Sequence, residues 1–288
     1  MRHVYECPMR WADLDQLGHV NNVVYADYLQ EARADMLRAL GAPERAADPA
    51  DGLVVVRHQM TYLEPLLFEF KPVLIECWVT EIRAASFTMA YEIFHLDDRG
   101  ERRVYLRAST VLTPFVFTEE RPRRITDHER ALLERFLEPA ERAVPWRRTP
   151  VAPSKVGHYP VQVRFSDVDV FGHVNNVKYL EYFQEARILT TSRLYRDLIA
   201  AGARHPHSVI AQVDVEYHVP LRFRGEPYDL WSRIAHVGTR SMTIESEIVD
   251  GDQLMARSRV VIVFYDLAAN RSTEPAPAIR SALVEAMG

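Results

Sequence analysis

The chain has 288 residues, about twice a common domain size. Its content of 48% hydrophobic and 26% charged residues is typical of a globular protein and excludes a collagen-like, disordered or disulfide-stapled miniature chain. The formal net charge of −5 argues against nucleic-acid binding, so we expect small molecules or other proteins as partners.

In chain order, the apolar spacing of the first half predicts one strand, one long helix, four strands and a short helix. The helix is indicated by apolar residues that recur every three or four positions from Tyr25 to Leu40. Thr126 and Glu129 form a capping-box pattern that opens the short helix at 125–137. The expected strands are Val4–Arg10, Leu53–Tyr62, Val73–Ile82, Phe87–Phe94 and Arg103–Phe117.

The second half follows the same plan, with a helix stripe from Tyr179 to Leu194. Its expected strands are Val161–Phe165, Val209–Tyr217, Tyr228–His236, Met242–Val249 and Met255–Tyr265. A sheet with one apolar face needs a helix to cover that face. We therefore predict an α+β fold in which each half packs one long helix on an antiparallel sheet.

The two halves are copies of one domain. Segment 10–33, RWADLDQLGHVNNVVYADYLQEAR, and segment 164–187, RFSDVDVFGHVNNVKYLEYFQEAR, are identical at fifteen of twenty-four positions. Tyr62, Pro65 and Leu66 also recur after a shift of 155 residues. A proline-rich stretch near residue 150 indicates a linker. We take residues 1–145 and 146–288 as the two domains.

The repeated segment carries polar residues that packing alone does not require. They are Asp13, Asp15, His19, Asn21 and Asn22 in the first copy, and Asp167, Asp169, His173, Asn175 and Asn176 in the second. For the glycine and asparagine residues a structural role is favoured, with Gly18 and Gly172 in turns and Asn21 and Asn175 as helix caps.

The second aspartate of each copy suggests chemistry, because a carboxylate just before a helix can face a carbonyl that is polarised by backbone N–H groups. We expect these donors between Gly18 and Val20 and between Gly172 and Val174. His19 and His173 are candidates to donate to the carbonyl or to orient the carboxylate, with a purely structural role as the alternative. Together these groups would suit acyl transfer to water.

The DxDxxGHVNNxxY pattern resembles the hotdog-fold thioesterases of the 4-hydroxybenzoyl-CoA thioesterase-like group and the plant acyl-ACP thioesterases. The resemblance implies tandem hotdog domains, with Asp15 and Asp169 as catalytic carboxylates and His19 and His173 as their companions. It also implies that the two units form an internal pseudo-dimer with interface sites, and that two chains can pair further as a homodimer.

The plant pattern is not complete in this chain. Its asparagine falls on Leu17 and Phe171, and its downstream glutamate falls near Pro65 and Pro220, where no carboxylate is present. The resemblance therefore favours the simpler mechanism, in which an aspartate acts beside a helix N-terminus. Asn22 and Asn176 belong to the substrate-binding segment in this interpretation.

Other residues have weaker claims. Tyr62 and Tyr217 either line the acyl pocket or pack the strand. The pairs Glu31–Arg33 and Glu185–Arg187 favour an ion-paired helix face or a buried strut over a catalytic acid. The sequence has no Walker A loop, zinc-ligand spacing or GxSxG elbow, so we expect no metal and no cofactor.

Location is inferred from what the sequence lacks. The first residues have no apolar core of a signal peptide, and the apolar run Val260–Tyr265 is far shorter than the roughly 20 residues of a spanning helix. Cys7 and Cys77 form no disulfide framework. We expect a cytoplasmic protein without membrane association.

These observations predict a hydrolase that cleaves acyl-CoA or acyl-ACP thioesters in fatty acid metabolism. One alternative is a hotdog hydratase or dehydratase, although such enzymes resemble a pattern with histidine five residues after aspartate and a proline between. Here the separation is four residues and proline is absent. The other alternative is a non-catalytic module that binds acyl thioesters.

Overall fold

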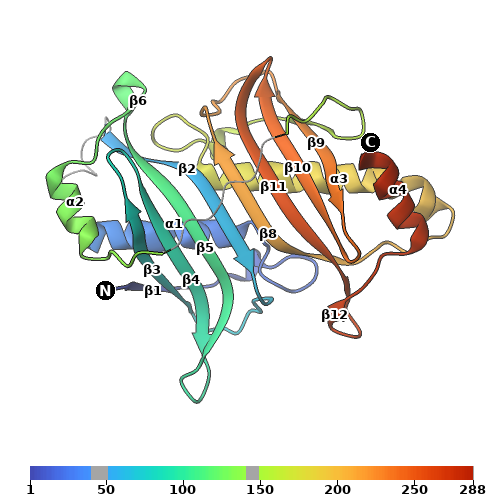
Figure 1. The fold of residues 1–288 in the computed structure, drawn as a ribbon, viewed down its shortest axis with the longest axis horizontal. Helices are drawn as coiled ribbons and strands as arrows, with labels where there is room; N and C mark the ends of the chain where they lie inside the picture. The colour runs from blue at the N-terminus through green and yellow to red at the C-terminus, as the bar shows by residue number, and fades with distance from the viewer. Residues whose placement is uncertain (40–50, 141–148, 288) are drawn as a thin grey trace. The chain divides into compact units, whose positions relative to one another are not determined.

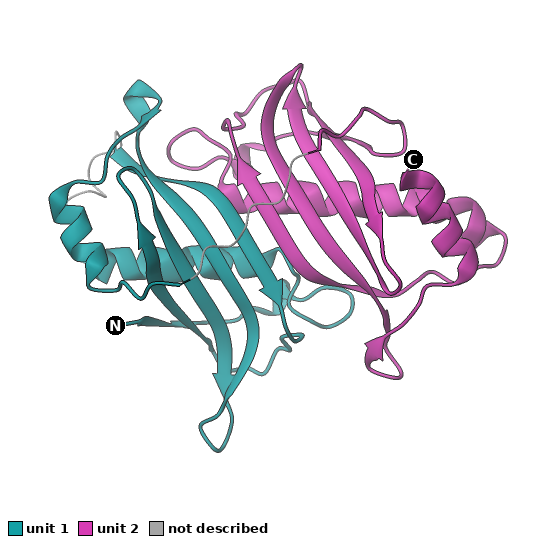
Figure 2. Cartoon of the chain, in the orientation of Figure 1, with its two compact units in different colours: residues 1–145 teal, residues 146–288 magenta. Residues whose placement is uncertain are grey.

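The computed structural model describes residues 1–39, 51–140 and 149–287. The chain divides into two compact units, Met1–Pro145 and Trp146–Gly288 (Figure 2). Each unit contains one long helix and one antiparallel sheet (Figure 1). The predicted α+β class is confirmed.

Unit 1 builds its sheet from five main strands in the order β1-β3-β4-β5-β2, and every neighbouring pair is antiparallel. The helix α1 (Val24–Ala39) contacts β1 and β3. The strands are β1 (His3–Cys7), β2 (Asp51–Tyr62), β3 (Val73–Ile82), β4 (Phe87–Leu96), β5 (Arg102–Val116) and the short β6 (Arg121–Pro122). The unit ends with α2 (Asp127–Glu134), which opens with the predicted capping box of Thr126 and Glu129.

Unit 2 repeats this sheet in the order β7-β9-β10-β11-β8, again antiparallel throughout. Its helix α3 (Asn176–Ala200) contacts β7 and β9. The strands are β7 (His158–Val161), β8 (Ser208–Tyr217), β9 (Tyr228–Val237), β10 (Ser241–Asp250), β11 (Gln253–Asp266) and the short β12 (Arg271–Ser272). A helix, α4 (Pro277–Met287), closes the unit.

The core of unit 1 lies between α1 and one face of the sheet. On β4 the side chains of Phe87, Met89, Tyr91 and Ile93 are buried, whereas the residues between them are partly exposed, because successive strand residues point to opposite faces. The predicted helix stripe is buried from Tyr25 to Met36, and its last member, Leu40, lies outside the described residues. The stripe predicted for α1 therefore identified its buried face, and so did the alternation predicted at Val73, Ile75, Cys77 and Val79 on β3.

Three sequence expectations differ from the structure. The edge strand β1 ends at Cys7 instead of Arg10, and β7 runs from His158 to Val161 instead of from Val161 to Phe165. In each unit a single 3-10 turn, Trp11–Asp13 or Phe165–Asp167, follows the strand. The closing helix α4 was not predicted. It buries Ile279 and Leu283, which are four residues apart on one face.

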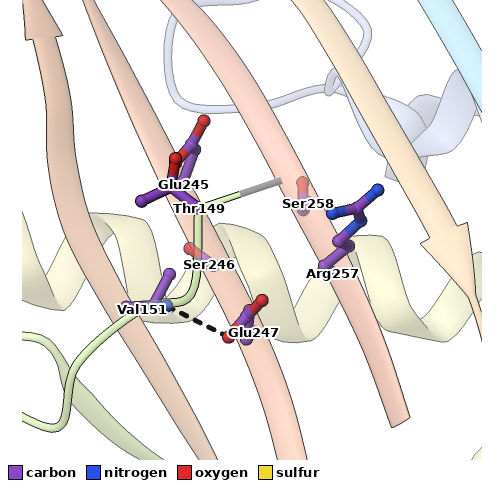
Figure 3. A pocket seen from close by; sticks show the side chains of 7 residues that line it. All are labelled: Thr149, Val151, Glu245, Ser246, Glu247, Arg257 and Ser258. Carbon is purple, nitrogen blue, oxygen red and sulfur yellow. Dashed lines mark hydrogen bonds between the residues drawn. The ribbon is translucent and has the colours of Figure 1, made fainter. Parts of the chain in front are cut away.

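The segment that follows the linker lies on the face of the second sheet opposite to α3 (Figure 3). The Val151 N–H donates a hydrogen bond to Glu247 Oε2 at 3.1 Å, and both residues are buried. The cavity beneath this segment measures about 10 Å³, room for about one water molecule. It is too small for a substrate.

Both cysteines are buried thiols of unit 1. Cys7 on β1 is 3% exposed and Cys77 on β3 is 0% exposed. Burial raises the pKa of each thiol to about 12, so the reactive thiolate is scarce at pH 8. We expect a thiol reagent such as DTNB to label neither cysteine in the native protein at pH 8 and to label both in denaturant. Fast labelling of the native protein would contradict the buried positions.

Candidate functional site

The Asp15 loop is a tight turn closed by its own backbone. The Asp15 N–H donates to the His19 carbonyl oxygen at 2.8 Å, and the Gly18 N–H donates to the Asp15 carbonyl oxygen at 3.0 Å. Gly18 has a φ of +77°, which residues with a Cβ adopt at a cost. In unit 2, Asp169 and Gly172 repeat the turn, with φ +79° at Gly172.

The positive φ explains the glycine of the motif and gives a prediction. A Cβ placed on Gly18 meets no atom within 4 Å, so Gly18→Ala changes backbone strain alone. We expect it to lower the free energy of unfolding by about 1–2 kcal/mol in a denaturant titration. Gly225→Ala is the matched control, since Gly225 also has open space around it and no positive φ. An equal loss in both variants would refute the explanation.

The Asp15 carboxylate is fixed by the turn that it belongs to. Asp15 Oδ1 accepts hydrogen bonds from the backbone N–H groups of Leu17 at 2.8 Å and His19 at 3.4 Å. Asp169 Oδ1 accepts the corresponding bonds from Phe171 at 2.9 Å and His173 at 3.3 Å. In the described part of the chain, no protein group hydrogen-bonds Oδ2 of either aspartate. Each carboxylate therefore has one anchored oxygen and one oxygen available for chemistry.

The first aspartate of the motif has a structural role. Asp13 is 2% exposed, and its Oδ2 accepts hydrogen bonds from the Tyr28 hydroxyl at 2.6 Å and the Arg10 N–H at 2.8 Å. Burial, and then the hydrogen bond to Asp13, raise the pKa of Tyr28, so the hydroxyl stays protonated as a donor. Asp167 and Tyr182 form the same 2.6 Å bond in unit 2. This pair ties the loop to the long helix.

The backbone donors that the sequence suggested are already engaged. The N–H groups of Gly18 and His19 donate to Asp15, and the N–H of Val20 donates to the Leu66 carbonyl oxygen at 2.9 Å. Gly172, His173 and Val174 repeat this arrangement, with Leu221 as the acceptor for Val174. These N–H groups are therefore not free to polarise a substrate carbonyl in this conformation.

The caps and tyrosines fix the start of each helix. The Asn175 side chain accepts from the Val177 N–H at 3.3 Å, which confirms the predicted cap, and the Asn21 side chain accepts from the Val23 N–H at 3.2 Å. The Tyr62 hydroxyl donates to the Asn22 carbonyl oxygen at 2.6 Å. Tyr217 donates to that of Asn176 at 2.9 Å. The two tyrosines thus contact the site by bonding the residue at the start of each long helix. His19 and His173 contact it through their backbone N–H groups, which bond Asp15 and Asp169.

The segments before β3 and β9 belong to the site, although the sequence reasoning did not assign them to it. Leu66 accepts a hydrogen bond from the Asp15 loop and Leu221 accepts one from the Asp169 loop, and Leu67 forms an isolated backbone bridge with His19. The repeated Tyr62, Pro65 and Leu66 were the available signal. They recur as Tyr217, Pro220 and Leu221, so both halves keep the same number of residues between the end of the strand and the leucine that bonds the loop.

The arginines of the repeated helix are buried struts. Arg33 is 7% exposed and Arg187 is 9% exposed, whereas Glu31 and Glu185 are exposed. The sequence left open whether these residues form an ion-paired helix face or a buried structural support. The low exposure of Arg33 and Arg187 favours the buried support for the two arginines. A catalytic acid at Glu31 or Glu185 has no support in this arrangement.

The comparisons with known proteins identify the family. The sequence profile of the thioesterase-like superfamily matches residues 9–137 and 163–283, once in each unit. The chain belongs to the thioesterase-like superfamily. A curated relative, the acyl-acyl carrier protein thioesterase ATL3 of Arabidopsis thaliana, is 32% identical over 98 residues, which are 34% of this chain. The matched region spans 51% of that relative, about half its length.

Solved structures show the fold of this superfamily member. A protein assigned as an oleoyl thioesterase from Lactobacillus plantarum has a TM-score of 0.74 at 17% identity, covering 92% of this chain and 97% of its own. The 12:0-ACP thioesterase from Umbellularia californica has a TM-score of 0.68 at 15% identity, covering 92% and 94%. At these identities the likeness concerns the fold. The predicted tandem hotdog domains of a thioesterase-like chain are confirmed.

Proposed function

We propose that the protein hydrolyses acyl thioesters of coenzyme A or acyl carrier protein, with Asp15 and Asp169 as the catalytic carboxylates. One observation carries this proposal: both units hold an aspartate by Oδ1 just before the long helix, and among the described residues none bonds Oδ2. Membership of the thioesterase-like superfamily supports thioester hydrolysis in general. A place in fatty acid metabolism and a cytoplasmic location are part of the same proposal.

Two routes use the same carboxylate. As a general base, Oδ2 takes a proton from water while the water oxygen attacks the carbonyl carbon. The tetrahedral intermediate then collapses, the C–S bond breaks, and the thiolate leaves with a proton returned from the carboxyl group. As a nucleophile, Oδ2 attacks the carbonyl and expels the thiolate, and water hydrolyses the resulting anhydride. Both routes place negative charge on the carbonyl oxygen.

That charge needs hydrogen-bond donors, and the first helical turn supplies them. N–H groups at a helix start lack acceptors within the helix and carry the positive end of the helix dipole. In unit 1 the N–H groups of Val23 and Val24 are held by Asn21. These two donors are therefore engaged, and we assign the oxyanion role in unit 1 to the N–H of Asn22, which precedes them, and in unit 2 to the equivalent N–H of Asn176. In this proposal His19 and His173 orient the substrate carbonyl.

A thiol-release assay tests the proposal. The purified protein is incubated with acyl-CoA thioesters of increasing chain length, and free thiol is measured with a chromogenic reagent. We expect release that depends on protein concentration. With crotonyl-CoA, loss of the conjugated double bond without thiol release would instead indicate a hydratase. Binding of every thioester without turnover would indicate a non-catalytic module.

In the described part of the chain, no helix combines the length and the apolar character needed to cross a membrane.

A further inference from the structure

A surface groove in unit 1 lies next to the Asp15 loop. It measures about 490 Å³, within the size range of small-molecule sites. Its walls come from the end of β1 and the segment before β3: Glu6, Pro8, Met9, Phe68, Phe70, Lys71 and Pro72. The same segment bonds the Asp15 loop through Leu66 and Leu67, so the groove lies beside the candidate site.

Aromatic rings form one side of this groove. Phe70 is 87% exposed and has a φ of +54°, a conformation that costs energy for a residue with a Cβ. Its ring centroid is 4.5 Å from that of Phe68, which in turn lies 5.8 Å from Trp11. Because the Phe70 ring is exposed, burial within this unit does not offset the energetic cost of its backbone conformation. The exposed surface of this ring is available for contact with an external ring.

The charged groups of the groove have complementary roles. Glu6 is exposed, and within the described residues its carboxylate has no hydrogen-bond partner. The Lys71 side chain is 49% exposed, and its Nζ lies 2.7 Å from Glu69 Oε2. A surface pair of this kind is weak and exchangeable. The groove therefore offers an acceptor for an amino group, a cation for a phosphate and exposed aromatic rings.

We propose that this groove binds the adenine nucleotide end of coenzyme A, so that unit 1 takes acyl-CoA as substrate. The adenine stacks on Phe70, its exocyclic amino group donates to Glu6, and Lys71 exchanges Glu69 for a phosphate oxygen. The proposal deepens the proposed function by naming the carrier. Binding of the nucleotide to this groove can be measured whether or not the protein hydrolyses the thioester.

Unit 2 lacks the corresponding groups. It keeps the aromatic pair Phe165 and Phe223, with ring centroids 6.0 Å apart. After the shift of 155 residues, however, Gly225 and Glu226 stand where unit 1 has Phe70 and Lys71. The position of Glu6 is taken by Pro160, after the shift of 154. The structure thus assigns one nucleotide site to each chain.

Calorimetric titration with adenosine 3′,5′-bisphosphate, the nucleotide end of coenzyme A, tests the site directly. We expect one site per chain and a Kd about tenfold higher in Phe70→Ala, equal to about 1.4 kcal/mol. Phe223→Ala, the matched exposed aromatic of unit 2, keeps the native Kd. Because the Phe70 side chain is almost fully exposed, the variant should unfold at the native denaturant concentration.

Kinetics supply a second measurement. In Phe70→Ala we expect the KM for an acyl-CoA to rise several-fold with kcat retained, and no change for the same acyl group on N-acetylcysteamine, which lacks the nucleotide. Absence of nucleotide binding to the native protein, or equal weakening by Phe223→Ala, would overturn the proposal. So would an effect of Phe70→Ala on an acyl-carrier-protein substrate alone, which would assign the groove to a protein carrier. If the nucleotide binds but no thioester is cleaved, the proposed hydrolysis fails and the groove stands.

Discussion

Replacing Asp15 and Asp169 together by asparagine is expected to reduce thioester hydrolysis by about 10²–10⁴-fold. The amide oxygen of asparagine can still accept the N–H groups that now bond Oδ1 of each aspartate, so the turn keeps its shape. The amide cannot take a proton from water, nor can it form an anhydride. Thiol release from an acyl-CoA measures the effect, and a double variant with full activity would contradict the assignment.

The single variants add information about the two units. Because both carboxylates have the same hydrogen-bonded setting, we expect Asp15→Asn and Asp169→Asn each to lower the rate, with the remaining activity contributed by the other unit. Denaturant unfolding of each variant is the control, and native-like curves would show that the loss is chemical. If one single variant already equals the double variant, only that unit is active.

Asp13→Ala is expected to lower the free energy of unfolding by about 3 kcal/mol. The substitution removes a buried carboxylate and leaves both the Tyr28 hydroxyl and the Arg10 N–H without their acceptor. The loss should appear in urea unfolding and in a lower rate, since the side-chain hydrogen bond that ties the loop to the long helix through Tyr28 is lost.

Tyr28→Phe is the matched control for this prediction. It removes the same 2.6 Å hydrogen bond from the other side but leaves Asp13 with its Arg10 contacts, at 2.8 Å to the backbone N–H and 2.9 Å to Nε. We expect a loss of about 1 kcal/mol. If Asp13→Ala costs less than Tyr28→Phe, the buried carboxylate is not the anchor of the loop.

Much of the fold followed from local patterns. The strands Val73–Ile82 and Phe87–Leu96 alternate between buried and partly exposed residues, and the sequence alternation located them to within two residues. The repeat placed both copies of the loop, because the same turn needs the same glycine and asparagine residues. The helix α4 was missed because its short apolar pattern, with Ile279 and Leu283, becomes informative only beside a sheet.

The site was predicted less completely, because hydrogen bonds between distant segments decide it. The sequence identified Asp15 and Asp169 as candidates, and that assignment stays a proposal. It could not show that the Val20 N–H is taken by Leu66, a partner 46 residues away. Nor could it reveal Phe70, since an exposed ring at positive φ has no pattern that distinguishes it from an ordinary strand or loop residue.

The hydrogen bonds that hold the Asp15 carboxylate all come from within four residues of it. The sheet that faces α1 is assembled from strands distributed over the rest of the unit. The residues that hold the proposed catalytic carboxylate and the residues that form the sheet therefore lie in separate segments of the sequence. For the proposed hydrolysis we therefore expect that a library varying strand residues alone changes the acyl-chain preference while the hydrogen bonds that hold the Asp15 carboxylate are kept.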